Sequence, residues 1–256
     1  MKDHSQIIHD QYDSQANAYL ISAVHAAGPD LQYAITLVEK TIPKGRGNFL
    51  DMGCGGGHLS YALAPHAHHV TAADPSPQMV ATVAAAAQEK GLGNIETVRA
   101  SANDMTFATG SFCIAASRYS AHHWRDTEAC IANMRRTIKP GGYLLMIDVV
   151  GHEDPLVDTH LQAMELLRDR SHIRNLTIPQ WRQIITLSGF ELLEEKTWPL
   201  PIAFAPWISR MKTSPEREKI ILTLQAESPA EAKQALQFAP DGSFMLQTGL
   251  FWAKAV

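Results

Sequence analysis

The sequence predicts an α/β fold in which helices cover both faces of a mostly parallel, doubly wound sheet. Two observations support this class. Strand-like and helix-like segments alternate from residue 48 onwards, and the segment 143–150 is an unbroken apolar run, typical of a strand buried on both faces. The 256 residues are enough for one large domain with an insertion. We therefore expect a single domain, 1–256.

The first strands and helices can be placed in order along the chain. A buried strand is expected over 48–53, and a short helix over about 57–64. The segment 68–74 is the next strand, and 77–92 is a helix with proline in its first turn and Gly91 at its end.

Two further strands, 95–101 and 112–119, complete the central part of the predicted sheet. A helix is expected over 126–138, and the sequence Lys139-Pro-Gly-Gly142 combines a helix stop with a turn. The strand 143–150 follows. These elements define a predicted cofactor-binding core over 46–150.

Beyond the core the pattern loosens. Helices are expected over 155–170 and 179–187, and strands over 190–198 and 243–256, which gives seven strands in all. The proline-bearing segment 199–240 reads as a helical insertion before the last strand.

The first 45 residues are predicted to form a helical cap, 1–45, with 24–40 packing across the sheet. This cap and the insertion 199–240 lie where a lid could form, and helices that only cover sheet edges are the alternative.

Composition and charge exclude several classes of protein. Hydrophobic residues make up 45% of the chain, charged residues 19%, and the net charge is −4. The absence of a basic excess argues against nucleic acid as a partner. No run of about eighteen apolar residues predicts a membrane span, and no signal-peptide pattern is present. Cys54, Cys113 and Cys130 read as reduced thiols, so we expect a cytoplasmic protein.

A glycine-rich turn, NFLDMGCGGGHLS, directly follows the first strand. In a dinucleotide fingerprint a third small residue would be needed where His58 stands, and a phosphate-binding P-loop would need a following Gly-Lys-Ser/Thr. Both patterns fail. The sequence instead has Asp51 two positions before Gly53, and Asp74 at the end of the second strand.

These two carboxylates predict a ligand other than a dinucleotide. Asp74 stands where a residue accepts hydrogen bonds from ribose hydroxyls. Asp51 could face an ammonium group, and the glycines let the backbone approach a ligand closely. S-adenosylmethionine (SAM) carries a ribose, an ammonium, a carboxylate and a sulfonium, and it fits this chemistry.

Several motifs occur in the order of a known family. LDMGCGGG, the Asp74 strand end, VRASANDMTFATGSFCIAASRYSAHHW and IKPGG resemble the class I SAM-dependent methyltransferases, closest to the ubiquinone/menaquinone-biosynthesis type (methyltransferase type 11). QYDSQANAYLISAVHAAGPDLQ, SRYSAHHW and SHIRN are similar to the YafE-like proteins. The resemblance implies a Rossmann-like, seven-stranded, mostly parallel sheet with N-terminal helices and a helical insertion before the last strand.

The resemblance also implies the cofactor site. S-adenosyl-L-methionine would be the cofactor and S-adenosyl-L-homocysteine the product, and the residues expected at the cofactor are Tyr19, Asp51, Gly53, Cys54, Gly55, Asp74, Pro75, Ser76, Met79, Ser101, Ala102, Ser117 and Arg118. Many relatives have Asp-Ala where this chain has Ser101-Ala102. A serine gives a weaker, neutral hydrogen bond to the adenine amino group than an aspartate does.

Candidate catalytic residues are His123 and Tyr19. An HH pair after the fourth strand is common in the resembling family, and it places His123 at the edge of the cavity. Adjacent side chains diverge, so His122 and His123 are not expected to share a metal, and no metal site is predicted. Trp207 and Arg210 could line the acceptor pocket, with a core tryptophan and a surface arginine as the alternative.

The resulting hypothesis is an enzyme that transfers a methyl group from SAM to an oxygen, nitrogen or carbon atom of a small molecule by in-line SN2 transfer. The protein is expected to be a monomer or homodimer. Alternatives are a non-catalytic SAM-binding sensor, a methyltransferase acting on protein or RNA, and a nicotinamide-dependent reductase.

Overall fold

Seven strands form one sheet in the order β3-β2-β1-β4-β5-β7-β6. The computed structural model of the protein describes residues 3–12 and 28–256. The first five strands pair in parallel, and β7 is antiparallel to both of its neighbours, β5 and β6. The strands are β1 (Asn48–Met52), β2 (His69–Asp74), β3 (Ile95–Arg99), β4 (Phe112–Arg118), β5 (Ile138–Val149), β6 (Phe190–Ile202) and β7 (Phe244–Ala255).

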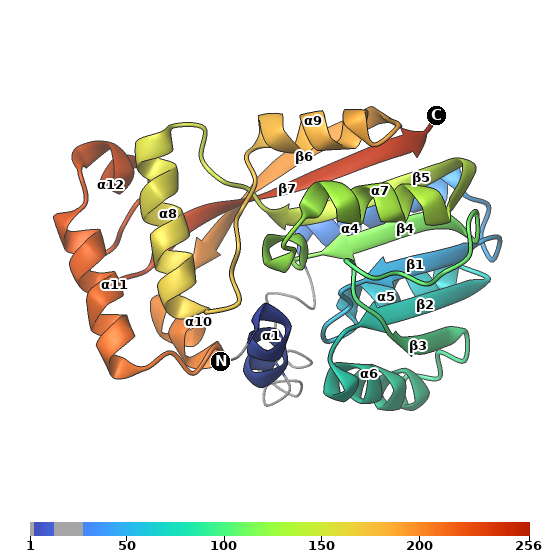
Figure 1. Ribbon diagram of the computed structural model, residues 1–256, viewed down its shortest axis with the longest axis horizontal. Coiled ribbons are helices and arrows are strands. Elements are labelled where there is room, and N and C mark those ends of the chain that lie inside the picture. The colour runs from blue at the N-terminus through green and yellow to red at the C-terminus, as the bar shows by residue number, and fades with distance from the viewer. Residues whose placement is uncertain (1–2, 13–27) are drawn as a thin grey trace.

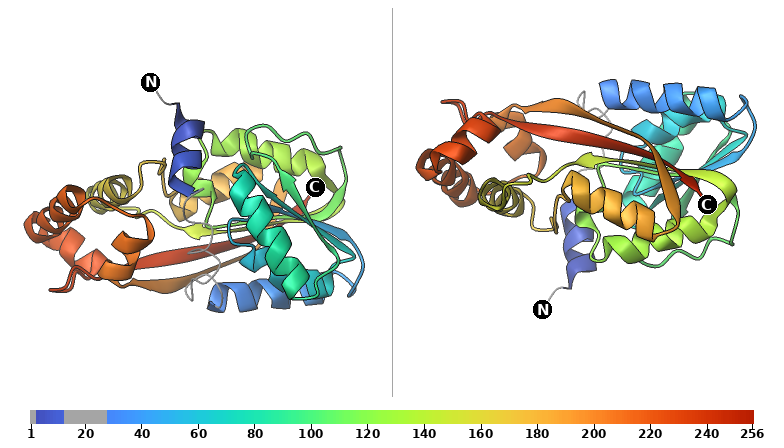
Figure 2. Two further views of the ribbon diagram at one scale, coloured as in Figure 1. Left: turned by 90° about the horizontal axis from the view of Figure 1, so that it is seen from below. Right: turned by 90° about the horizontal axis from the view of Figure 1, so that it is seen from above.

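Helices cover both faces of this sheet (Figures 1 and 2). The helices are α1 (His4–Tyr12), α4 (Pro29–Thr41), α5 (His58–Leu63), α6 (Pro77–Glu89), α7 (Thr127–Thr137), α8 (Pro155–Arg168), α9 (Ile178–Leu187), α10 (Phe204–Arg210), α11 (Pro215–Glu227) and α12 (Ala230–Leu236). Figure 2 shows α4 on one side of the sheet and α7 and α9 on the other. The predicted fold class, a seven-stranded and mostly parallel sheet wound on both faces, is confirmed.

Local sequence signals explain where several helices begin. Pro77 occupies the first turn of α6, and the Ser76 side chain accepts a hydrogen bond from the Met79 backbone N–H. At α9, Thr177 and Gln180 form a reciprocal capping box. These caps satisfy backbone groups that the helix itself leaves without partners.

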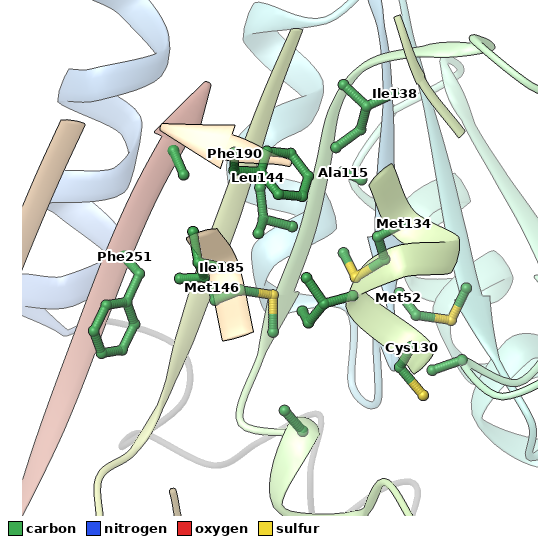
Figure 3. Packing of buried hydrophobic residues seen from close by; sticks show 14 of the residues in the cluster. Met52, Ala115, Cys130, Met134, Ile138, Leu144, Met146, Ile185, Phe190 and Phe251 are labelled. Carbon is green, nitrogen blue, oxygen red and sulfur yellow. The ribbon is translucent and has the colours of Figure 1, made fainter. Parts of the chain in front are cut away.

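The core between the sheet and helices α7 and α9 is apolar and fully buried (Figure 3). Met134 of α7 and Ile185 of α9 are inaccessible to solvent, and they belong to the same cluster as Leu144 and Met146 of β5. Strand side chains alternate between the two faces, so Leu145 and Ile147 of β5 belong to the opposite cluster, with α4 and α5. This alternation explains why β5 is apolar throughout.

A separate group of four helices, α8, α10, α11 and α12, forms a third cluster at one end of the molecule (Figure 1). We call it the helical group. It packs around the far ends of β6 and β7, where Ile202 and Phe244 are buried against Trp207 and Leu236. The long β6–β7 pair therefore joins the helical group to the sheet.

Several boundaries differ by a few residues from those predicted, and two of the differences change how a segment is interpreted. The insertion was expected from residue 199, but β6 continues to Ile202, with Pro199 paired to Gln247 and Pro201 to Met245. Proline interrupts a strand by removing a hydrogen-bond donor, and an edge strand tolerates this on its unpaired side. Because β6 is the edge of the sheet, its prolines did not end it.

The expected turn at Lys139-Pro-Gly-Gly142 is incorporated into β5 instead. Phe112 pairs with Ile138 and Ile114 pairs with Tyr143, so the extra residues bulge out between the two pairs. Gly141 has φ +72°, a conformation that glycine adopts without a steric penalty. Within the described residues, no helix is long and apolar enough to cross a membrane.

Candidate active site

A cavity lies at the carboxyl ends of the parallel strands, where loops after β1, β2, β4 and β5 meet the helical group. Open α/β sheets place ligand sites at this edge. Most of the residues predicted at the cofactor or as catalytic line the cavity, namely Asp51, Gly53, Cys54, Gly55, Asp74, Pro75, Met79, Ser101, Ala102, Arg118 and His123. Tyr19 lies outside the described residues.

The glycine-rich loop turns the chain sharply at the end of β1. Gly53, Gly55 and Gly57 all have positive φ angles, of 71°, 48° and 81°. A Cβ at Gly53 would overlap the Ser120 hydroxyl, whereas a Cβ at Gly55 would meet nothing within 4 Å. The loop is therefore packed on one side at Gly53 and open to the cavity at Gly55.

Asp51 is a buried carboxylate on the cavity wall and is 1% exposed. Its Oδ2 accepts a hydrogen bond of 2.6 Å from the Ser60 hydroxyl, while its Oδ1 has no partner among the described residues. Burial raises the pKa of Asp51 to about 6, although the hydrogen bonds from Ser60 oppose the shift. A buried carboxylate with one unpaired oxygen is stabilised when a ligand supplies a hydrogen-bond donor or a cation.

Asp74 is held in place by backbone groups. The Gly55 N–H donates to Oδ2 and the Ser76 N–H donates to Oδ1, each over 2.9 Å. Each carboxylate oxygen can accept more than one hydrogen bond, so the carboxylate can also accept from a ligand in the cavity. The glycine loop and the residues after β2 thus together orient the Asp74 carboxylate as a hydrogen-bond acceptor.

Two of the predicted cofactor residues are not on the cavity wall. The Ser76 side chain caps α6, and its backbone N–H donates to Asp74. Ser117 is fully buried in β4 and its hydroxyl lacks a hydrogen-bond partner in the described part of the chain. The resemblance to the family suggested both residues, but a position in a motif could not show which way a side chain points.

Arg118 lines the cavity and also anchors α4. Its Nε donates to the Asp30 carboxylate over 2.6 Å, and both side chains are 4% exposed. The guanidinium lies over the Tyr119 ring, 4.7 Å from its centroid. Tyr119 itself has φ +54°, an uncommon value for a residue other than glycine. Arg118 therefore fixes the loop after β4 to the N-terminal end of α4.

His122 and Asp148 form a pair that the sequence did not single out. The His122 Nδ1 lies 2.6 Å from Asp148 Oδ1, and the His122 backbone N–H donates to Oδ2 over 3.1 Å. Burial lowers the pKa of His122, but the charge and hydrogen bond of Asp148 outweigh it, so the pKa is raised. With Nδ1 on the carboxylate, Nε2 is the ring atom that can accept a proton.

His123, the predicted catalytic residue, has different surroundings. Its Nδ1 lies 3.1 Å from the Ser171 carbonyl oxygen. Burial and the neighbouring charge of His122 lower the pKa of His123 to about 4. A neutral imidazole with this pKa is a weak base, so His122 suits proton removal better than His123. The sequence alone does not distinguish the two adjacent histidines. Asp148, near the end of β5, contacts His122 and so gives the two rings different surroundings.

The described residues contain no group of three or more His, Cys, Asp or Glu side chains that could hold a metal ion. Cys54 lines the cavity, but burial and the charges of Asp74 and Asp51 raise the pKa of its thiol well above the usual value. The thiol is therefore an unreactive part of the wall.

Residues 50–146 match a family model described as a methyltransferase domain. The chain is 31% identical over 222 residues to the uncharacterized methyltransferase YcgJ of Bacillus subtilis, covering 87% of each chain. It is 35% identical over 188 residues to the uncharacterized protein YafE of Escherichia coli, covering 73% of this chain and 91% of that one. The chain belongs to the class I SAM-dependent methyltransferases. It is of the YafE-like type, as the motifs predicted.

Solved structures agree with this family. The crystal structure of YcgJ superimposes with a TM-score of 0.82 at 28% identity, covering 88% of this chain and 98% of that one. A putative methyltransferase from Bacillus halodurans gives a TM-score of 0.83 at 28% identity, with 89% and 99% covered. In both comparisons the match extends beyond the glycine-rich loop to most of each of the two chains.

Sequence reasoning left out two cavity residues contributed by the helical group. These are Glu165 and Arg168 of α8, which line the same cavity as the glycine loop. Trp207 and Arg210 of α10, which the sequence did suggest, also line this cavity. The sequence pattern does not show that α8 packs in the helical group rather than on the sheet. Its charged residues were therefore expected on the surface.

Proposed function

We propose that this methyltransferase uses SAM to methylate a small molecule bound between the cofactor loops and the helical group. The observation that carries the proposal is the pair of carboxylates beside the glycine loop. Asp51 is buried, and one of its oxygens has no partner in the part of the chain that the structure describes, while the Asp74 carboxylate is oriented by two backbone N–H groups. An ammonium and a ribose are the chemical groups that these acceptors suit.

Each cofactor residue has a task in this proposal. Asp51 would bind the ammonium group of SAM and Asp74 its ribose hydroxyls, while Met79 and Ala102 give an apolar wall for the adenine. Ser101 lies beside them and can hydrogen-bond a ring substituent. Bound SAM supplies an electrophilic methyl group. The protein binds, aligns and shields the reactants, because in-line displacement depends mainly on orientation.

The acceptor would lie next to His122, between the cofactor loops and α8. Asp148 fixes the His122 ring and keeps its Nε2 available to accept a proton from a hydroxyl or amine. Buried apolar walls from β6, β7 and α10 surround this end of the cavity, including Ile202, Leu246 and Trp207. A concave, mainly apolar cavity favours a small molecule over a protein or RNA strand.

Calorimetric titration of the purified protein with SAM, S-adenosylhomocysteine and NADH tests the cofactor. We expect micromolar binding of the first two and no binding of NADH. Binding of NADH alone would overturn the proposal. If SAM bound but no acceptor in a broad chemical screen were methylated, the protein would be a SAM sensor instead.

Replacing Asp74 tests the proposed ribose contact. Asp74→Ala should weaken S-adenosylhomocysteine binding by about 1–3 kcal/mol, because ribose hydroxyls would lose their acceptor. Glu96→Ala is a matched control, since Glu96 is an exposed carboxylate on the neighbouring strand, outside the cavity. Unchanged affinity in Asp74→Ala would place the ribose elsewhere.

A further inference from the structure

Glu165 of α8 is a buried, cavity-lining carboxylate, and within residues 3–12 and 28–256 it accepts no hydrogen bond from a side chain or backbone group. Its side chain is 10% exposed, and its nearest charged neighbour is the Arg168 guanidinium at 3.6 Å. That distance is an ion pair but is longer than a hydrogen bond. No described donor reaches the carboxylate, although buried carboxylates in proteins are nearly always hydrogen-bonded. A ligand in the cavity can supply the missing donor.

Arg168 stands one helical turn further along α8 and is fixed in position. Its Nε donates to the Trp207 carbonyl oxygen over 3.1 Å, and its guanidinium lies over the Trp207 ring, 5.0 Å from the centroid. The Arg168 side chain is 9% exposed. The cavity wall therefore presents a hydrogen-bond acceptor, Glu165, directly beside a hydrogen-bond donor, Arg168.

The charges of this pair favour a neutral ligand group. Burial raises the pKa of Glu165, and the charge of Asp169 adds to the shift, while the charges of Arg168, His122 and Arg210 reduce it. The Glu165 carboxylate and the Arg168 guanidinium form an ion pair, so their charges offset each other. A carboxylate on a ligand would face Glu165, and an ammonium would face Arg168, so either charge meets repulsion at one member.

We propose that Glu165 and Arg168 recognise the methyl acceptor through a neutral amide-type edge, in which an N–H lies beside a carbonyl oxygen. The N–H donates to Glu165, and Arg168 donates to the carbonyl oxygen. Primary amides, lactams and heteroaromatic rings with a ring amide carry such an edge. The assignment of this ligand as the methyl acceptor rests on the proposed function, whereas the recognition by the pair does not.

Four probes that share one hydroxyphenyl body test the inference by calorimetry. They are 4-hydroxybenzamide, its ester counterpart methyl 4-hydroxybenzoate, the anion 4-hydroxybenzoate and the cation 4-hydroxybenzylamine. Each is titrated with and without saturating S-adenosylhomocysteine. We expect the amide to bind about tenfold more tightly than the ester, because the ester keeps the carbonyl oxygen but cannot donate to Glu165. Both charged probes should bind more weakly than the amide.

Two variants assign the contacts to residues. Glu165→Met should lower the affinity for the amide about tenfold and leave that for the ester unchanged, since only the amide donates to Glu165. Arg168→Met should lower both affinities, because both probes carry the carbonyl oxygen. Arg182→Met is the matched control. Arg182 lies on the exposed face of α9, where its side chain is 57% exposed and pairs with Glu195 of β6. This substitution should change neither affinity.

Several outcomes would overturn the inference. Equal loss of amide and ester binding in Glu165→Met would show that Glu165 only shapes the pocket. Preference for the anion or the cation, or no binding of the amide in either condition, would exclude an amide-type edge. If S-adenosylhomocysteine failed to bind while the amide still bound through Glu165 and Arg168, the proposed function would fail and the inference would stand.

Discussion

Buried carboxylates with incomplete hydrogen bonding decide the chemistry of this cavity at the residue scale. Asp51 and Glu165 lie on its wall, one in β1 and the other on α8. Burial raises the pKa of each, so each destabilises the ligand-free protein at neutral pH. Buried groups of this kind are retained where a bound ligand satisfies them. The ligand-free protein is then less stable because the group is needed for binding.

The Asp51 carboxylate provides a direct test of this trade between stability and binding. We expect Asp51→Asn to raise the free energy of unfolding by about 1–3 kcal/mol at pH 8, because a buried charge is removed. The folded-state pKa is raised to about 6, so the penalty is present above that pH and fades as the pH falls toward 3.8.

Denaturant unfolding at pH 8 and pH 5, with and without S-adenosylhomocysteine, measures the effect. The gain should be larger at pH 8, and the ligand should bind the variant more weakly. A variant less stable than the wild type at pH 8 would show that the Asp51 carboxylate is satisfied in the native protein.

The His122–Asp148 pair predicts the opposite dependence on pH. The folded-state pKa of His122 is raised, so the pair contributes stability fully below pH of about 6.5 and loses it as the pH rises through the folded-state value. Asp148→Asn should therefore lower the His122 pKa measured by NMR. It should also destabilise the protein more at pH 6 than at pH 9.

A pKa of His122 that does not move in Asp148→Asn would mean that the short contact is absent in solution. The sequence did not identify this pair, since its members are 26 positions apart and the HH motif does not show which histidine meets Asp148. By contrast, Asp51 and Asp74 were found because each occupies a fixed place relative to the glycine loop or a strand end.

At the scale of elements, the sequence was most informative where burial dictates the pattern. β5 is apolar throughout because both of its faces are covered, and α6 begins at a proline behind a serine cap. Prediction failed where neighbours decide the outcome. The prolines in 199–202 remain in a strand because β6 is an edge strand. Helix α8 packs in the helical group, although its apolar stripe could equally well pack against a sheet.

The glycine loop yields a prediction with a matched control inside the same chain. Gly55 and Gly141 both have positive φ, of 48° and 72°, and a Cβ at either would meet nothing within 4 Å. Alanine at either position should cost about 1–2 kcal/mol of stability from backbone strain. Only Gly55 borders the cavity.

Gly55→Ala should therefore weaken S-adenosylhomocysteine binding at least about tenfold, because a methyl group displaces favourable contacts in a tight site. Gly141→Ala should bind it normally despite a similar loss of stability. Calorimetry on both variants makes the comparison, and equal affinities would show that the ligand does not approach the backbone at Gly55.

The whole molecule has two apolar bodies, the sheet with its covering helices and the helical group, and β6 and β7 run through both (Figure 1). The cavity takes the wall that we propose for the cofactor from one body and the wall that we propose for the acceptor from the other. Relative movement of the two bodies would change the distance between bound cofactor and acceptor, and transfer of a methyl group is sensitive to such distances. The β6–β7 pair, which runs without a register shift from the Glu194–Trp252 pair to the Ile202–Phe244 pair, opposes that movement.

Coupling through this strand pair predicts that the two bodies unfold together. Ile221 of α11 is fully buried in the helical group, far from the main core, and Ile221→Ala should cost about 2–4 kcal/mol. The tryptophans report separately on the two bodies, since Trp181 lies in the main core and Trp207 in the helical group. Single-tryptophan versions of Ile221→Ala should lose their fluorescence at the same denaturant concentration, below that of the wild type. If Trp207 reported an earlier transition than Trp181, the helical group would open by itself, and the acceptor wall would be a mobile part of the site rather than a fixed one.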